Sequence, residues 1–152
     1  MKPHLLVTAL GAVLTLAACN GPARTGGNAK ICADFTAAKP AAGAPGANGA
    51  TAVDDCAKRW AYSLASSRDD AEVVAEAVKT ACGAQLSTWN QQTVNQPGGE
   101  GESASLLTGE PTTPLAEHNA YLSRRALFYV VQARAGSCPA PAAKDGAPEG
   151  VG

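Results

Sequence analysis

The chain has 152 residues and a formal net charge of −1, and it contains 33 alanines, 16 glycines and 10 prolines. Leu, Ile, Val and Phe number 25, and seven of them lie in the first 18 residues, which leaves 18 in the other 134. This shortage of large apolar side chains excludes a large α/β enzyme domain, because long parts of the chain cannot bury enough surface to offset the entropy of ordering. The composition predicts a small, partly disordered protein.

Residues 1–18 have the pattern of a secretory signal peptide. Lys2 gives a short positive region, and an uncharged apolar run from Leu5 to Leu16 is followed by small residues. The apolar run is too short to cross a membrane, which takes a helix of about 20 residues. We therefore expect export of the chain and removal of residues 1–18.

The end of this segment, Leu16-Ala17-Ala18-Cys19, resembles the lipobox of bacterial lipoprotein precursors. The resemblance implies diacylglyceryl transfer to the Cys19 thiol, cleavage after Ala18 and acylation of the new N-terminus. Each buried acyl CH₂ contributes about 0.8 kcal/mol, so several chains on one residue anchor a protein durably. In that family the residue after the cysteine decides which membrane the protein goes to. Asn20, where Asp would imply the inner membrane, implies an anchor in the inner leaflet of the outer membrane, facing the periplasm. The alternative is a plain secretory signal in which Cys19 is incidental.

Two segments rich in Ala, Gly and Pro flank the predicted domain. Residues 19–52 are predicted to be a tether, since such sequences behave as flexible or semi-extended coils. Within it, the apolar residues around Cys32 between Ile31 and Phe35 indicate a short stretch that is pinned to the domain. Residues 136–152 are predicted to be a flexible tail.

Residues 53–135 are predicted to form an all-α domain of three helices, at 53–66, 70–94 and 114–135. In the first, apolar residues recur at spacings of three and four (Val53, Cys56, Trp60, Leu64). The second begins after the acids of 69–72, and its Gly83 costs about 1 kcal/mol relative to Ala. The third begins at Thr113-Pro114 and ends before Gly136. We expect the first two helices to form an antiparallel hairpin.

Four cysteines remain once Cys19 is assigned to lipidation. An even number in an exported small domain predicts two disulfides, and the spacings of 24, 26 and 56 residues contain no paired-ligand motif for zinc. In an antiparallel hairpin, two residues that are equally far from the turn lie at the same height on the two helices. If the turn lies near residue 69, the numbers of two such residues sum to about 138. Cys56 and Cys82 satisfy that sum, which leaves Cys32 to pair with Cys138. Coincidence in an alanine-rich segment is the alternative, and the other connectivities stay open.

The segment from Cys56-x-x-x-Trp60-Ala61-Tyr62 to Ala81-Cys82 looks like that of small exported bacterial proteins with a disulfide-stapled helical hairpin. The resemblance covers about 30 residues and implies no activity.

No catalytic, metal or cofactor site is predicted. His118 follows Glu117, but adjacent residues of a helix do not face each other, so a surface or helix-flank histidine is expected rather than a catalytic one. No serine lies in a G-x-S-x-G context. Loss of Lys2 takes the net charge from −1 to −2, and Arg124-Arg125 is an isolated basic pair, so nucleic-acid binding is not expected.

Two aromatic residues off the main helical stripes, Tyr62 and Phe128, are predicted to be possible partner contacts. The sequence thus favours a lipid-anchored outer-membrane protein with a binding or structural role toward an envelope protein or cell-wall partner, and not an enzyme. The alternatives are an inhibitor or immunity-type lipoprotein that blocks a cell-wall enzyme and, less favoured, a small hydrolase centred on His118.

Overall fold

The structure is a computed structural model that describes residues 28, 30–35, 49–98, 101–105 and 108–151. The predicted signal peptide, the lipobox and Asn20 lie outside the described residues. None of the helices in these ranges combines the length and the hydrophobicity that crossing a membrane requires.

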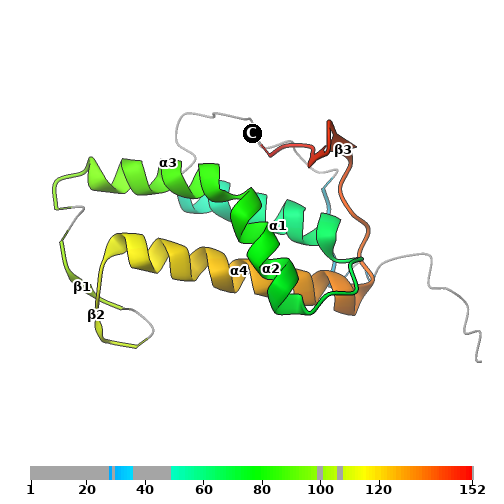
Figure 1. The fold of residues 1–152 in the computed structure, drawn as a ribbon, viewed down its shortest axis with the longest axis horizontal. Coiled ribbons are helices and arrows are strands. Elements are labelled where there is room, and N and C mark those ends of the chain that lie inside the picture. Colours follow the sequence, from blue (N-terminus) through cyan, green and yellow to red (C-terminus); the bar gives the residue numbers. More distant parts are fainter. Residues whose placement is uncertain (1–27, 29, 36–48, 99–100, 106–107, 152) are drawn as a thin grey trace, which may run out of the picture.

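The protein is all-α, as predicted. Its helices are α1 (Gly49–Leu64), α2 (Ala71–Ala81), α3 (Gly83–Val94) and α4 (Pro114–Gly136). In Figure 1, α1, α3 and α4 lie along the long axis of the molecule, and α2 crosses it at a steep angle. Short antiparallel pairs join β1 (Ser103–Ala104) to β2 (Pro111–Thr112) and β3 (Ala143–Lys144) to β4 (Ala147–Pro148).

The second predicted helix is two helices. The chain bends at Cys82, whose φ of −95° and ψ of 12° depart from helical geometry, and α3 starts at Gly83. The side chain of Cys82 is tied to α1 by a disulfide, and Gly83 weakens the helix at the same place. The hairpin with α1 is therefore bent: α2 crosses the bundle, and α3 then returns antiparallel to α1 (Figure 1).

The helix boundaries follow from local capping. The Oγ1 of Thr113 accepts a hydrogen bond from the backbone N–H of Ala116 at 3.3 Å, and Pro114 occupies the first helical position of α4. At the other end Ser137, in the left-handed conformation with φ of 49°, ends α4 directly after Gly136. Asp70 directly precedes α2, and its side chain makes no capping hydrogen bond.

The core is built from small side chains. Fourteen apolar residues are buried, and alanine and valine supply most of them: Val53, Cys56, Ala57, Ala61, Tyr62, Val74, Ala75, Val78, Cys82, Leu122, Ala126, Tyr129, Val130 and Ala133. Because alanine buries little area, this core contributes less per residue than one made of leucine and phenylalanine. Covalent bonds between the helices matter correspondingly more.

Both predicted disulfides are confirmed. Cys56 of α1 is bonded to Cys82 with their Cα atoms 5.9 Å apart, and Cys32 is bonded to Cys138 with Cα atoms 5.4 Å apart. The first bond is fully buried, whereas both cysteines of the second are partly exposed.

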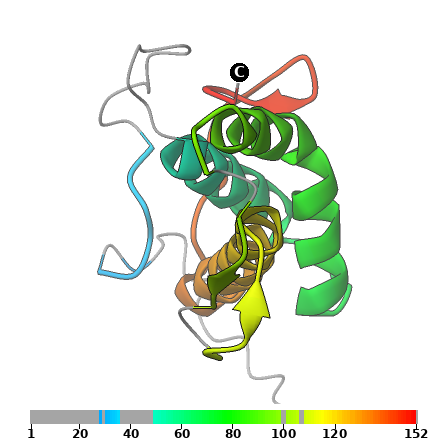
Figure 2. The same ribbon diagram turned by 90° about the vertical axis from the view of Figure 1, so that its left-hand side faces the viewer.

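The N-terminal strap, which we define as residues 28 and 30–35, is pinned to the domain as expected. The backbone N–H of Asn28 donates to the carbonyl of Gly136 at 3.0 Å, and that of Ala33 donates to the hydroxyl of Tyr62 at 3.0 Å. Phe35 packs edge-on against Tyr62, with ring centroids 5.1 Å apart. Figure 2 shows that the strap and α2 lie on opposite sides of the bundle.

The segment after α4, predicted to be a flexible tail, instead forms a hairpin that packs on α1. Its two-residue turn has positive φ at Asp145 (52°) and Gly146 (83°), as a type I′ turn requires. Arg59 of α1 donates from Nη1 to the carbonyl of Glu149 at 2.8 Å. The helical domain also begins earlier than predicted, at Gly49.

Two glycines at helix ends differ in the room around them. A Cβ atom on Gly136 would lie 2.6 Å from Cys138 Sγ and 2.9 Å from Cys32 Sγ, whereas a Cβ on Gly83 would meet nothing within 4 Å. Gly136 therefore lets the disulfide between Cys32 and Cys138 close against α4. Gly83 is not needed for packing.

We predict that Gly136→Ala lowers the free energy of unfolding by about 1–3 kcal/mol, because the new methyl group overpacks the disulfide. The matched change Gly83→Ala should raise it by about 0.5–1 kcal/mol, because alanine is the better helix former. Urea unfolding followed by circular dichroism measures both. Equal effects of the two substitutions would contradict this description of the α4 terminus.

Candidate functional site

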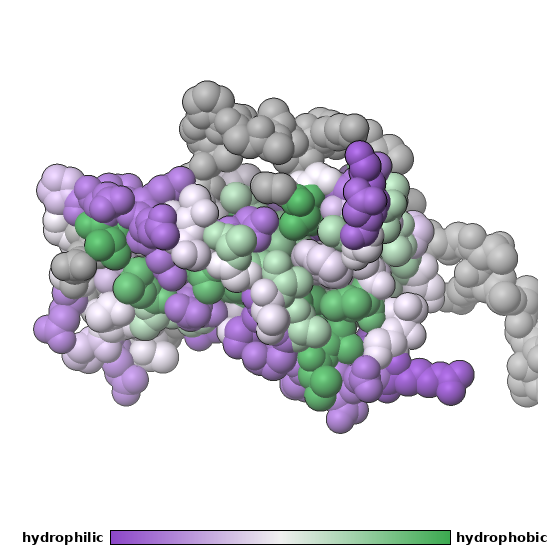
Figure 3. Space-filling view, turned by 45° about the horizontal axis from the view of Figure 1, so that its top comes forward, coloured by the Kyte–Doolittle hydropathy of each residue, from purple (hydrophilic) through white to green (hydrophobic). Residues whose placement is uncertain are grey.

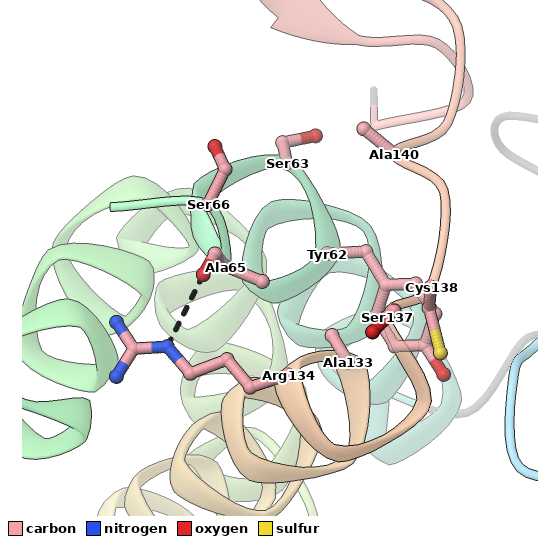
Figure 4. Close-up of a pocket in the computed structure, with 9 residues that line it drawn as sticks. All are labelled: Tyr62, Ser63, Ala65, Ser66, Ala133, Arg134, Ser137, Cys138 and Ala140. Carbon is pink, nitrogen blue, oxygen red and sulfur yellow. Dashed lines mark hydrogen bonds between the residues drawn. The ribbon is translucent and has the colours of Figure 1, made fainter. Parts of the chain in front are cut away.

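A pocket of about 320 Å³ lies between the C-terminal ends of α1 and α4 and the segment that follows α4. Figure 4 shows its lining, which is made mostly of small and hydroxyl-bearing side chains: Tyr62, Ser63, Ala65, Ser66, Ala133, Arg134, Ser137, Cys138 and Ala140. All of these residues are described, and none is a histidine or a carboxylate that could act as a base. The pocket can accommodate a small polar molecule but offers no acid–base pair.

The charged side chain of the pocket, Arg134, is already engaged. Its Nε donates to the carbonyl of Ala65 at 3.1 Å, and its Nη2 donates to those of Ser67 at 3.1 Å and Asp69 at 2.8 Å. In Figure 4 the guanidinium points away from Tyr62 and Cys138. Arg134 thus satisfies the carbonyls at and beyond the end of α1, a common use of basic side chains at helix C-termini.

The densest group of ionisable side chains surrounds Asp54 on α1. One carboxylate oxygen accepts hydrogen bonds from Arg125 and, at 3.3 Å, from the hydroxyl of Tyr121; the other accepts from the hydroxyl of Tyr129 at 2.8 Å. Arg125 also bonds to Tyr129, and Lys58 lies 3.8 Å from the carboxylate. Sequence reasoning missed this cluster, although the i,i+4 pairs on α1 (54 and 58) and on α4 (125 and 129) were a usable signal.

The electrostatics of the cluster favour a permanently ionised Asp54. Burial alone raises the pKa of this carboxyl, but hydrogen bonds from Arg125 and Tyr129 outweigh it and hold the pKa below its ordinary value of 3.8. Burial, together with the bond to Asp54, raises the pKa of Tyr129 well above 10. The shifts at Asp54, Arg125 and Tyr129 all move the pKa away from neutrality, and the cluster joins α1 to α4.

His118, expected at the surface or on a helix flank, lies between α4 and α3. It is only 9% exposed, and its ring stacks on Trp89 with centroids 3.5 Å apart and an interplanar angle of 14°. Its Nδ1 lies 2.8 Å from Oδ1 of Asn90; since a carbonyl oxygen accepts, Nδ1 carries the proton. The imidazole therefore joins α4 to α3.

Burial lowers the pKa of His118 below its ordinary value of 6.5. Above the pKa that His118 has in the unfolded chain, its neutral ring contributes fully to the free energy of unfolding. As the pH falls through the folded-state pKa this contribution is lost, because the unfolded chain takes up the proton more readily. The other histidine of the chain, His4, lies in the segment predicted to be removed.

We predict that the free energy of unfolding of the mature protein falls between about pH 7.5 and pH 5, and that His118→Phe, which keeps an aromatic ring against Trp89, removes most of this fall. Urea unfolding of both proteins across the range measures it. The same slope with and without the imidazole would show that His118 titrates normally in the folded state.

The two predicted partner contacts differ in exposure. Tyr62 is 2% exposed and its hydroxyl accepts the hydrogen bond from Ala33, so it is a core residue and the prediction for it is wrong. Phe128 is 52% exposed on α4, and Val131, one turn further, is 51% exposed. On the side of the molecule drawn in Figure 3, hydrophobic residues form patches interrupted by hydrophilic ones.

No three His, Cys, Asp or Glu side chains of the described ranges are grouped closely enough to hold a metal ion. No family model matches the chain, and comparison with curated proteins and with solved structures finds no match. The function therefore has to be argued from the residues themselves.

Proposed function

We propose that this protein is a bacterial lipoprotein, anchored through Cys19 in the inner leaflet of the outer membrane, whose helical domain binds an envelope or cell-wall partner in the periplasm. The observation that carries the proposal is the sequence Leu16-Ala17-Ala18-Cys19 directly behind an apolar segment. Asn20 in the following position supports the outer-membrane destination.

The disulfides support this proposal from a separate direction. Disulfides persist in oxidising compartments such as the periplasm and are rare in the cytosol, and this small domain carries two. Since Cys32 pairs with Cys138 and Cys56 with Cys82, none of the four is available as a partner for the fifth cysteine, Cys19. A thiol left over in an exported chain needs another role, and acylation supplies one.

The exposed surface of α4 supports a binding role better than the pocket does. The pocket offers hydroxyl groups and an arginine already bonded to backbone carbonyls. By contrast, α4 presents two half-exposed large apolar side chains one turn apart, Phe128 and Val131. Exposed apolar residues that adjoin one another on a helix mark surfaces that contact another protein or a membrane.

Cys19→Ser should abolish acylation, because the thiol that receives the diacylglyceryl group is gone. We expect mass spectrometry of the parent protein from bacterial envelopes to find acyl chains on Cys19, and the variant to remain as an unprocessed precursor or a soluble protein. In the same fractionation Asn20→Asp should shift the acylated protein toward the inner membrane. Cys32→Ser, which removes a thiol outside the lipobox, is the control and should leave acylation unchanged. Acylation that persists in Cys19→Ser would refute the anchor.

A further inference from the structure

The chain enters the domain at the C-terminal end of α4. The N–H of Asn28 is bonded to the carbonyl of Gly136, and Cys32 is covalently joined to Cys138. Nine peptide units separate Asn28 from Cys19, and a fully extended chain covers at most about 3.6 Å per residue, so the span is no more than about 32 Å. A lipid on Cys19 therefore keeps this end of α4 close to the membrane surface.

The surface next to this point of entry is apolar. Phe128, Val131 and Ala135 are exposed at i, i+3 and i+7 and share one side of α4. Ile31 of the strap is 37% exposed, and its carbonyl accepts a hydrogen bond from Gln132 at 2.8 Å. We call these four apolar residues (Ile31, Phe128, Val131 and Ala135) the α4 apolar face.

Basic residues border the α4 apolar face. Arg124 is exposed one turn before Phe128, and Lys30 is exposed next to Ile31. The guanidinium of Arg125 lies 5.4 Å from the ring centre of Phe128, although its charge is offset by Asp54.

Acidic residues lie mostly elsewhere. Between residues 124 and 136 the helix has three arginines and no acid, and Asp34 is the one acid among the described residues of the strap. Glu102, Glu110 and Glu117 belong to the β1–β2 region and the first turn of α4, at the opposite end of this helix (Figure 1). Asp69 and Asp70 lie just before α2, which is on the side away from the strap (Figure 2), although the carbonyl of Asp69 accepts a hydrogen bond from Arg134 of α4.

We propose that the α4 apolar face lies on the membrane that holds the lipid of Cys19, with Phe128 and Val131 at the boundary between headgroups and acyl chains and with Arg124 and Lys30 against lipid phosphates. The inference rests on the proposed lipid anchor. A tether of this length holds the face at an effective concentration of about the millimolar range, so a contact too weak to recruit a free protein is sufficient. A contact along this side of α4 restricts how the domain turns on its tether.

The test places a fluorescent reporter on the face. The acylated full-length mature protein carrying Phe128→Trp is reconstituted in vesicles of phosphatidylethanolamine and phosphatidylglycerol whose acyl chains bear bromine, a contact quencher of indole. The emission of the new indole is obtained by subtracting the emission of the parent protein, which comes from its half-buried Trp60 and Trp89. We expect this difference to be at least twofold lower in brominated vesicles than in vesicles without bromine. Val73→Trp is the matched control, because Val73 is 58% exposed on α2, and its emission should not change.

Equal emission from F128W in brominated and plain vesicles would overturn the proposal. Protection of this indole from aqueous iodide without quenching by bromine would also overturn it, since a second copy or another protein would then cover the face. Mass spectrometry of the same sample separates the two proposals. Acylated protein with an unquenched indole refutes only the membrane contact, whereas protein with no acyl chain on Cys19 refutes the anchor and the contact together.

Discussion

The disulfide between Cys56 and Cys82 fixes the place where α1, α2 and α3 meet. Cys56 lies in the middle of α1, and Cys82 is the residue between α2 and α3. Alanine and valine make up most of the surrounding core, so apolar burial alone gives the domain only a small free energy of unfolding. Closing a loop of 26 residues contributes about 3.5 kcal/mol in the chain-entropy model, a large part of the 5–15 kcal/mol net stability of a typical domain.

Arginine side chains perform much of the positioning that large apolar residues perform elsewhere. Arg59 holds the C-terminal hairpin on α1, Arg125 joins α4 to Asp54, and Arg134 bonds to three carbonyls at the end of α1 and the start of the following loop. In each contact the donor is a charged guanidinium, and such hydrogen bonds are stronger than neutral ones. Because these three arginines are occupied inside the fold, Arg124 is the arginine of α4 whose side chain is left to the surface.

Much of the fold could be predicted because local signals and covalent constraints agree. The cap at Thr113-Pro114 and the stop at Gly136 define α4. The even number of cysteines and the expected hairpin predicted both disulfides, although α2 crosses α1 where the straight hairpin predicted a matched antiparallel register (Figure 1). The bend at Cys82 escaped prediction because it depends on the bond to α1 as well as on Gly83. The C-terminal hairpin depends on Arg59, 90 positions away in the sequence from Glu149, although Asp145-Gly146 is a turn signal that could have been read.

The candidate site was less predictable because helical periodicity does not say which element each side of a helix meets. His118 was expected at the surface or on a helix flank and is covered by Trp89. Tyr62 was expected to be a possible contact and lies under the strap. Phe128 kept its predicted exposure because no described element packs over that side of α4. The lipobox stays a prediction, because its four contiguous residues lie outside the described part of the chain.

A domain whose core is mostly alanine and valine depends on covalent bonds, and urea unfolding of the double variant Cys56→Ala/Cys82→Ala measures that dependence most directly. If the account is right, the unfolding midpoint falls and the free energy of unfolding drops by about 3 kcal/mol or more relative to the oxidised parent. A double variant that unfolds at the same urea concentration as the parent would contradict it, because the small apolar core would then be sufficient to hold α1, α2 and α3 together.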